Sequence, residues 1–111
     1  MQYCLMVYAE PGHVEALSDA QREAARAEFF ALAEDAQIID HVELRPAETA
    51  TCVRMAGGRT LMTDGPFADT KEVLGGIVLV EAGNLDEAIL AARIASDAVD
   101  GVVEIRPVVP H

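Results

Sequence analysis

Basic residues are scarce in this sequence, and their scarcity excludes several kinds of partner. Eight lysines and arginines stand against nineteen aspartates and glutamates, which gives a formal net charge of −11. A surface of this charge repels polyanions, so we expect no nucleic acid and no anionic membrane surface as a partner. The sequence also lacks an apolar run of the roughly 20 residues that a membrane-spanning helix needs.

Cysteines and catalytic motifs are scarce as well. The two cysteines, Cys4 and Cys52, lack the spacing of a zinc knuckle or a redox pair, so we interpret them as small buried apolar residues. The sequence has no serine nucleophile motif, phosphate-binding loop or dinucleotide-binding fingerprint, and we therefore expect no cofactor and no metal. The start of the chain has no basic leader and soon reaches Glu10, which predicts a cytoplasmic protein.

Apolar residues, by contrast, are abundant enough for one globular domain. The 111 residues are 51% hydrophobic and 24% charged, which is an ordinary globular composition. A chain of this length buries roughly two-thirds of its unfolded surface around one core. We therefore predict a single domain over residues 1–111, without repeats or linkers.

Apolar periodicity predicts six strands and two helices. The expected strands cover residues 2–9, 38–45, 51–55, 59–63, 76–80 and 102–106, and the expected helices run from Ser18 to about residue 36 and from Asn84 to about residue 97. Ser18 and Asn84 each precede Gln or Glu by three residues, a capping pattern that starts a helix. Gly57-Gly58 between two β-prone runs predicts a tight hairpin turn.

The expected faces of these elements indicate an α+β fold. The helix pattern places Arg22, Glu23 and Arg26 toward water in the first helix, and Leu85, Ala88, Ile89, Ala92 and Ala95 on the buried face of the second. The order strand, helix, strand, hairpin, strand, helix, strand is typical of a split βαβ arrangement, an antiparallel sheet with both helices on one face. The first strand and the strand at Ile77 are apolar on both faces, so the uncovered face needs a partner. A second copy closes this contact under two-fold symmetry, which predicts a homodimer packed sheet against sheet.

The segment Thr63–Glu72, with the sequence TDGPFADTKE, is the most unusual part of the chain. It restricts φ at Pro66, frees φ at Gly65 and includes the large aromatic ring of Phe67. Irregular loops of this kind often carry binding and catalytic residues. The segment therefore predicts a functional site. Gly75-Gly76, which follows it, is better explained by a bulge at a strand entry than by a phosphate-binding loop.

Each polar or aromatic residue of this loop has a functional and a structural interpretation. Asp64 serves as a base or ligand anchor, or it forms the turn through nearby backbone N–H groups. Phe67, beside Pro66, either walls a pocket or fastens the loop, and fastening is the favoured role. Lys71 contacts either a substrate or, as we favour, solvent.

Residues outside the loop allow the same two interpretations. Arg106 holds a carboxylate of a substrate or, as we favour, takes part in an internal ion pair. Tyr8 offers its hydroxyl group to a cleft beside the loop, or its ring packs in the core while the hydroxyl group contacts solvent. His41 and Glu43 lie on one side of a strand, a spacing that suits proton transfer, although a surface histidine is favoured and metal binding is disfavoured.

The run Thr63–Glu72 resembles the signature of the DGPF-domain proteins, a branch of the YCII-related family. The segments Ala50–Arg54, Leu74–Gly76, Leu85–Ala88 and Val103–Val108 also look like that family in the same order, so the resemblance covers nearly the whole chain. The resemblance implies a ferredoxin-like fold that pairs into a dimeric α+β barrel.

For function the resemblance implies less. Members of the family are mostly uncharacterised, and many are encoded beside extracytoplasmic-function sigma factors. A related branch is thought to use a histidine and an aspartate in a small-molecule enzyme, with the histidine at the first helix. Here the residues from Ser18 to Ala36 contain no histidine, and the nearest one, His13, precedes them. The dyad of that branch therefore does not transfer directly to this sequence.

Two hypotheses of function follow. The first is a cofactor-independent small-molecule enzyme or ligand-binding dimer with a cleft at the loop Asp64–Phe67. In it, Asp64 transfers a proton in lyase-like or isomerase-like chemistry, and Lys71 or Arg106 positions a polar or anionic substrate. The second is a non-catalytic accessory module that docks on a partner protein such as an extracytoplasmic-function sigma factor, steered by its acidic surface. The unusual loop favours the ligand cleft.

Overall fold

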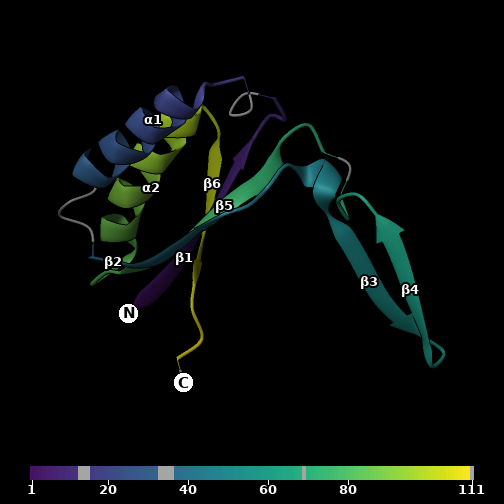
Figure 1. Cartoon of the computed structure of the whole chain (residues 1–111). Helices are drawn as coiled ribbons and strands as arrows, with labels where there is room; N and C mark the ends of the chain where they lie inside the picture. The colour runs from purple at the N-terminus through teal and green to yellow at the C-terminus, as the bar shows by residue number, and fades with distance from the viewer. Residues whose placement is uncertain (13–15, 33–36, 69, 111) are drawn as a thin grey trace.

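The computed structural model shows an antiparallel four-stranded sheet with two helices on one face (Figure 1). It describes residues 1–12, 16–32, 37–68 and 70–110. The elements are β1 (Gln2–Ala9), α1 (Asp19–Leu32), β2 (Gln37–Glu43), the 3-10 helix η1 (Ala47–Thr49), β3 (Thr51–Ala56), β4 (Arg59–Asp64), β5 (Val73–Glu81), α2 (Leu85–Val99) and β6 (Val102–Pro107). Among the described residues, no helix combines the length and the apolar composition that crossing a membrane requires.

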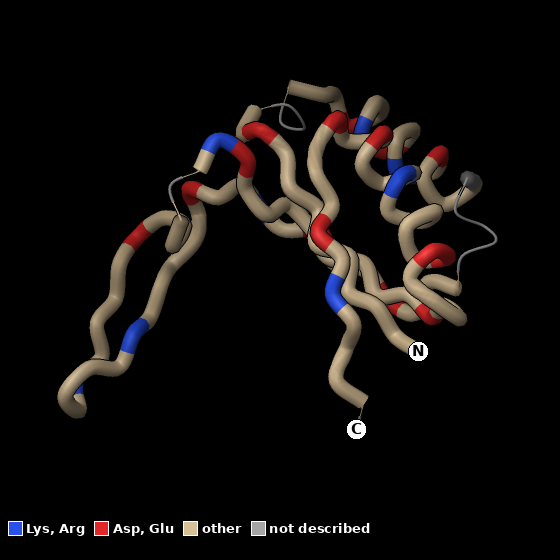
Figure 2. The backbone as a smooth tube through the Cα atoms, turned by 180° about the vertical axis from the view of Figure 1, so that it is seen from behind, with Lys and Arg blue, Asp and Glu red and all other residues tan. Residues whose placement is uncertain are grey.

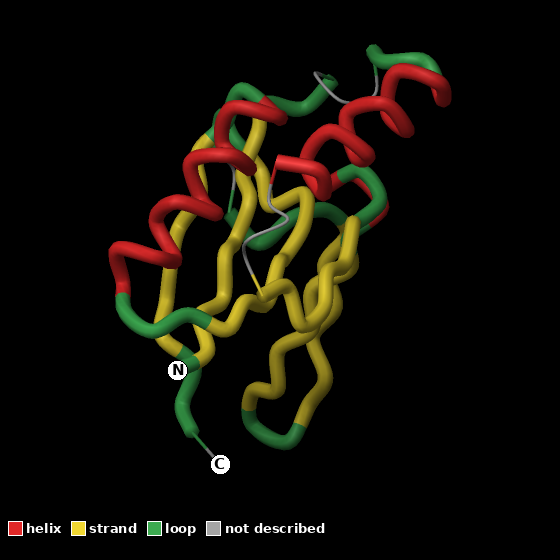
Figure 3. The backbone as a smooth tube through the Cα atoms, turned by 90° about the vertical axis from the view of Figure 1, so that its left-hand side faces the viewer, coloured by secondary structure: helices red, strands yellow, loops and turns green. Residues whose placement is uncertain are grey.

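The strand order identifies the predicted ferredoxin-like α+β fold. The sheet has the order β2-β5-β1-β6, and the hairpin β3–β4 forms a separate sheet inserted between β2 and β5. Each half of the fold is a strand, a helix and a strand, with β1 and β5 in the middle of the sheet. Figure 3 views the molecule from the helix side, with both helices in front of the strands. The predicted α+β arrangement with an inserted hairpin is therefore confirmed.

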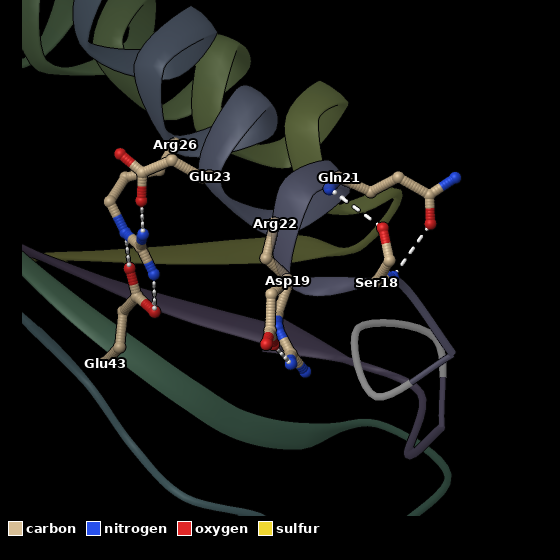
Figure 4. Close-up of polar contacts among 7 residues, drawn as sticks. All are labelled: Ser18, Asp19, Gln21, Arg22, Glu23, Arg26 and Glu43. Atoms are coloured by element: carbon tan, nitrogen blue, oxygen red, sulfur yellow. Dashed lines mark hydrogen bonds and ion pairs between the residues drawn. The ribbon is translucent and has the colours of Figure 1, made fainter.

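Both helices begin where the capping patterns predict. The backbone N–H of Ser18 donates to Gln21 Oε1 at 2.8 Å, and the N–H of Gln21 donates to Ser18 Oγ at 3.1 Å (Figure 4). In α2, Asn84 Oδ1 accepts from the N–H of Glu87 at 3.0 Å, while Glu87 Oε2 accepts from the N–H of Gly83 at 2.7 Å. These contacts satisfy N–H groups that have no partner inside the helix. The predicted end of the first helix, at residues 33–36, lies outside the described residues.

The core lies between the middle strands and the alanine face of α2. Its fully buried or nearly buried residues are Tyr3, Leu5, Val78, Val80, Ala82, Ala88, Ala91 and Ala92. The prediction for α2 is correct at Ala88, Ala92 and Ala95, but Leu85 and Ile89 are 49% and 37% exposed. The buried stripe is centred on small residues that let the helix approach the sheet closely, so these two larger side chains lie on its flank or at its end.

Gly75-Gly76 forms a bulge inside β5, and its two glycines have different roles. Gly76 pairs with Val7, but the register shifts before Tyr8, which leaves Gly75 as the extra residue of a bulge. A Cβ atom on Gly76 would lie 2.9 Å from the carbonyl oxygen of Val42 on β2. The predicted bulge is confirmed, although β5 begins before it and not after it as expected.

The hairpin β3–β4 projects away from the body of the molecule. Gly57 and Gly58 have φ values of 56° and 76°, which are the left-handed conformations of the predicted tight turn. Figure 1 shows the hairpin on the side of the sheet opposite the helices. This placement separates the hairpin and the loop that follows it from the helix layer.

Candidate functional site

A cavity of about 240 Å³ lies between α1, β2 and the helix face of the sheet. Apolar side chains form much of its wall, including Ala25 and Phe29 on α1, Val78 on β5, and Ala95 and Val99 on α2. Helix α2 packs on the sheet through buried alanines, whereas the α1 side of the cavity is lined by larger side chains such as Phe29. A mainly apolar hollow with a few polar groups is the usual form of a small-molecule site.

Strand β2 directs two polar side chains toward this cavity. His41 and Glu43 pair with Val78 and Gly76, and cross-strand partners share a face of the sheet. Because Val78 belongs to the buried helix face, His41 and Glu43 also face the helices, as their predicted common side requires. The imidazole ring of His41 packs edge-on against Phe30 of α1, with ring centroids 4.8 Å apart.

A bidentate ion pair joins α1 to β2 at the cavity wall. Arg26 donates from Nε to Glu43 Oε1 at 2.6 Å and from Nη2 to Oε2 at 2.9 Å, and its third nitrogen donates to Glu23 (Figure 4). The hydrogen bonds from Arg26 lower the pKa of Glu43, and Glu43 in turn raises the pKa of Arg26. One turn earlier, Arg22 is paired with Asp19.

Arginines gather at this cavity although the chain as a whole is acidic. Arg22, Arg26 and Arg45 contribute to its wall, together with the acids Glu10 and Glu43. The wall therefore has three arginines and two acids, with Arg26 paired to Glu43 and Arg22 paired to the exposed Asp19. Guanidinium groups bind carboxylates and phosphates through paired hydrogen bonds. The arrangement is therefore suited to a small molecule with an apolar body and an anionic group.

The prediction that Arg22, Glu23 and Arg26 face solvent on α1 is incomplete. The side chains of Arg22 and Arg26 are 37% and 36% exposed, and both reach the cavity. The decisive partner of Arg26 is Glu43, seventeen positions away on another element. Helical periodicity reports only which residues share a side of one helix, so it cannot reveal this contact.

The loop residues singled out from the sequence lie elsewhere. Asp64, Pro66, Phe67, Lys71 and Arg106 are all exposed, and none of them lines the cavity. Phe67 is 82% exposed, so the prediction that its ring fastens the loop within its own chain is wrong. An aromatic loop residue is buried only if another surface meets it, and no such surface belongs to the described part of this chain.

Three of the predicted residues have identifiable neighbours. Lys71 Nζ lies 3.0 Å from Glu10 Oε1, and this hydrogen bond raises the pKa of Lys71. Arg106 Nε donates to Glu104 Oε2 at 2.6 Å, the internal ion pair that was favoured. Tyr8 is half-buried on β1, beside β6. Because Glu10 also lines the cavity, the Lys71 pair connects the predicted loop to the cavity wall.

Asp64 ends β4, where backbone contacts hold the start of the loop. It pairs with Thr51 across the hairpin, and the next residue, Gly65, donates its N–H to the carbonyl oxygen of Ala50 at 2.8 Å. Gly65 has a φ of 94°, which favours glycine, and its carbonyl oxygen accepts from Cys52 Sγ at 3.2 Å. Gly65 thus explains part of the motif structurally. Whether the Asp64 carboxylate also acts on a ligand stays a prediction.

The remaining sequence predictions concern cysteine, metal and histidine. Cys4 and Cys52 are free and half-buried, so they are less buried than predicted. Across residues 1–12, 16–32, 37–68 and 70–110, no group of three or more His, Cys, Asp and Glu side chains is arranged to hold a metal ion. His13, the histidine nearest to the first helix, lies outside the described residues.

Comparisons with known proteins match the whole chain to one protein family. A family model described as YCII-related domain matches residues 1–111. An uncharacterized protein of Rhizobium meliloti (strain 1021) is 33% identical over 113 residues, and the alignment covers 96% of this chain and 91% of that protein. The description of this relative states no activity, ligand or partner.

Proposed function

This chain belongs to the YCII-related domain family, and from its geometry we propose that it binds a small molecule in the cavity between α1 and the sheet, without a cofactor. The observation that carries the proposal is the cavity itself, about 240 Å³, with mainly apolar walls that include three arginines. Sites for drug-sized ligands are roughly 300–1,000 Å³, so this ligand is smaller than most drugs.

The arginine positions define the chemistry of the ligand. Arg26 is fixed by two hydrogen bonds to Glu43, whereas Arg22 is paired with Asp19, a carboxylate that is 98% exposed. An exposed ion pair contributes little stability, so a ligand carboxylate can replace Asp19 at small cost. The proposed ligand therefore places an anionic group at Arg22 and an apolar body against Ala25 and Val78.

Proton-transfer chemistry is the catalytic form of this proposal. His41 faces the cavity from β2 and is oriented by its packing against Phe30. Imidazole is the commonest acid and base in enzymes, and lyase-like or isomerase-like reactions need only a proton carrier and a charge anchor. His41 is the candidate proton carrier in the cavity. Asp64 remains the candidate at the loop, where a substrate cleft requires a further surface over Phe67.

We also propose that the protein is a homodimer, packed through the sheet face that the helices leave open. Two cross-strand rows run over this face, one comprising Asp40, Leu79, Cys4 and Arg106, and the other Val42, Ile77, Met6 and Glu104. Each row has apolar side chains at its centre and a charged residue at one end or both. Such a self-complementary strip supports a two-fold contact between identical faces.

A second candidate function rests on the charge of the molecule. Figure 2 shows acidic residues distributed over the helices and the sheet of the body, in a chain of net charge −11. A surface of this sign favours association with a basic protein surface. This observation supports the accessory module that docks on a partner such as a sigma factor. A cavity that binds none of the probes described below would favour this second candidate.

Small carboxylates test the proposed cavity. We expect benzoate and hexanoate to shift backbone amide signals of cavity residues such as Ala25 and Val78 in ¹H–¹⁵N spectra, while the matching neutral amides do not. Arg22→Gln should weaken carboxylate binding about tenfold or more, because it removes a charge-assisted hydrogen bond. The measurement is the dissociation constant from the titration.

Arg93→Gln is the matched control for this experiment. Arg93 is an exposed arginine of α2 that does not line the cavity, so its replacement should leave carboxylate binding unchanged. Signal shifts confined to residues 64–68 and 70–72 would move the ligand site to the loop. Equal weakening by both variants would show that only overall charge matters, and the cavity proposal would then be wrong.

A further inference from the structure

The hairpin β3–β4, here called the arm (Thr51–Asp64), exposes a row of large apolar side chains. Val53 pairs with Met62 across the hairpin, and Met55 lies two positions along on the same face. These three residues are 63%, 73% and 64% exposed in the described structure. Proteins seldom leave contiguous apolar side chains in water unless another molecule covers them.

The arm also differs in charge from the rest of the chain. It contains two arginines, Arg54 and Arg59, and a single acidic residue, Asp64, at its end. The other eighteen acidic residues lie outside the arm in the sequence, and Figure 2 shows acidic residues on the helices and the sheet of the body. The arm is therefore complementary in charge to the body of an identical molecule.

The position of the arm fits a contact between copies. It projects on the side of the sheet that the helices leave open (Figures 1 and 2), and the molecule measures 47 × 39 × 20 Å along its principal axes. A molecule packed on the open sheet face would therefore lie beside the arm. An isolated two-stranded hairpin is marginally stable in water, so the arm itself gains from such a neighbour.

We propose that the arm of each copy packs against the body of a second copy of this chain in a reciprocal contact. Val53, Met55 and Met62 cover apolar surface of the second copy. Arg54 and Arg59, on the other face of the hairpin, attract its acidic residues. This inference rests on the proposed homodimer and adds to it a specific element. The same contact covers Phe67, which follows the arm directly, so the loop site would be complete only in the dimer.

The charge pattern distinguishes a second copy from other occupants. A basic protein would be repelled by Arg54 and Arg59 on the arm. An anionic membrane would attract these two arginines but repel the acidic body to which the arm is attached. Only an acidic partner with an apolar strip satisfies both features of the arm. The open sheet face of this chain has Asp40 at one end of its strip and the pair Glu104–Arg106 at the other, in a chain of net charge −11.

Sedimentation velocity of arm variants tests the proposal. We expect the wild type to form dimers at micromolar concentration, and Met62→Lys to raise the dimer dissociation constant at least about tenfold, because lysine cannot be buried unpaired in an apolar contact. Leu61→Lys is the matched control. Leu61 is 48% exposed on the opposite face of the same strand, where it pairs with Arg54. A lysine there adds positive charge to the face of the arginines, so this variant should dimerise at least as well as the wild type does.

The outcomes distinguish the proposed role of the arm from the proposed homodimer itself. A monomeric wild type would overturn both proposals. A dimer whose dissociation constant is unchanged by Met62→Lys would leave the homodimer standing and overturn the role of the arm. Weakening by Leu61→Lys alone would overturn the assigned face. Circular dichroism of each variant confirms that the fold is retained.

Photo-crosslinking provides a second measurement that does not depend on weakened assembly. Benzoylphenylalanine at position 62, in an equimolar mixture of ¹⁴N-labelled and ¹⁵N-labelled protein, forms covalent bonds to neighbouring residues on irradiation. We expect cross-linked peptide pairs that join light to heavy chains, with the second peptide from the body of the other copy. Cross-links confined within one isotopic species would overturn the proposal.

Discussion

At the scale of single residues, the pair Arg26–Glu43 has the clearest pH-dependent consequence. Arg26 lowers the pKa of Glu43 in the folded protein, so the pair stabilises the fold above the ordinary glutamate pKa of about 4.5. This stabilisation is lost as the pH falls through the lowered folded value. Glu43 is 57% exposed, so the effect is small, and Glu43→Gln should lower Tm at pH 7 by at most about 4 °C.

The measurement is Tm by circular dichroism between pH 3 and pH 7. The difference between the wild type and Glu43→Gln should shrink toward acid pH, because both chains then lack the charged carboxylate. Glu28→Gln, an exposed change on α1, the helix of Arg26, serves as the control and should leave the profile unchanged. A Tm difference that stays constant across this pH range would contradict the assigned role of the ion pair.

The sequence predicts side-chain contacts correctly where the two residues are close together in the chain. Ser18 with Gln21 was predicted because a capping contact involves neighbours in the chain. The Arg26–Glu43 contact is not predicted by the sequence, because it joins two elements and depends on a bulge in β2 that sets which side chains face α1. The candidate site shows the same limit. The loop was conspicuous by composition, whereas the cavity arises from spacing between elements, which composition does not report.

At the scale of elements, the pairing of β2 with β5 depends on the absence of a side chain at Gly76. A methyl group there would meet the carbonyl oxygen of Val42 at 2.9 Å, and a backbone atom cannot move aside without disturbing the strand. Gly76→Ala should therefore destabilise the protein by about 1–3 kcal/mol. Urea unfolding followed by circular dichroism measures this free energy.

Gly75→Ala is the neighbouring control for this prediction. The nearest atom to a Cβ at Gly75 is the carbonyl oxygen of Val7 at 3.9 Å, which is an ordinary contact. This variant should stay within about 0.5 kcal/mol of the wild type. Equal destabilisation by the two variants would show that the bulge conformation, and not the close approach of β2, requires glycine.

The predicted helices and strands are correct in type and order, and the error on the buried face of α2 has a clear cause. The sheet, the hairpin turn and both helices follow from periodicity and turn chemistry within each segment. Leu85 and Ile89 were placed in the core because they are large and apolar, yet the sheet selected the alanine side of α2. Tertiary packing therefore decides which of two apolar stripes is buried, and a single helix does not contain that information.

At the scale of the whole molecule, charge both opposes and directs assembly. Two copies of net charge −11 repel one another at long range, while the arginines of the arm attract the acidic body at short range. Arg59→Glu and Arg93→Glu change the net charge equally, but only the first lies on the arm. We therefore expect Arg59→Glu to weaken the homodimer more than Arg93→Glu does in about 20 mM salt, as measured by sedimentation velocity.

At about 1 M salt, where the screening length is about 3 Å, the dimer dissociation constants of the two variants should become equal, because exposed charges no longer interact across the contact. Equal weakening at low salt would mean that net charge alone governs association, and the arginines of the arm would then have no specific role in pairing.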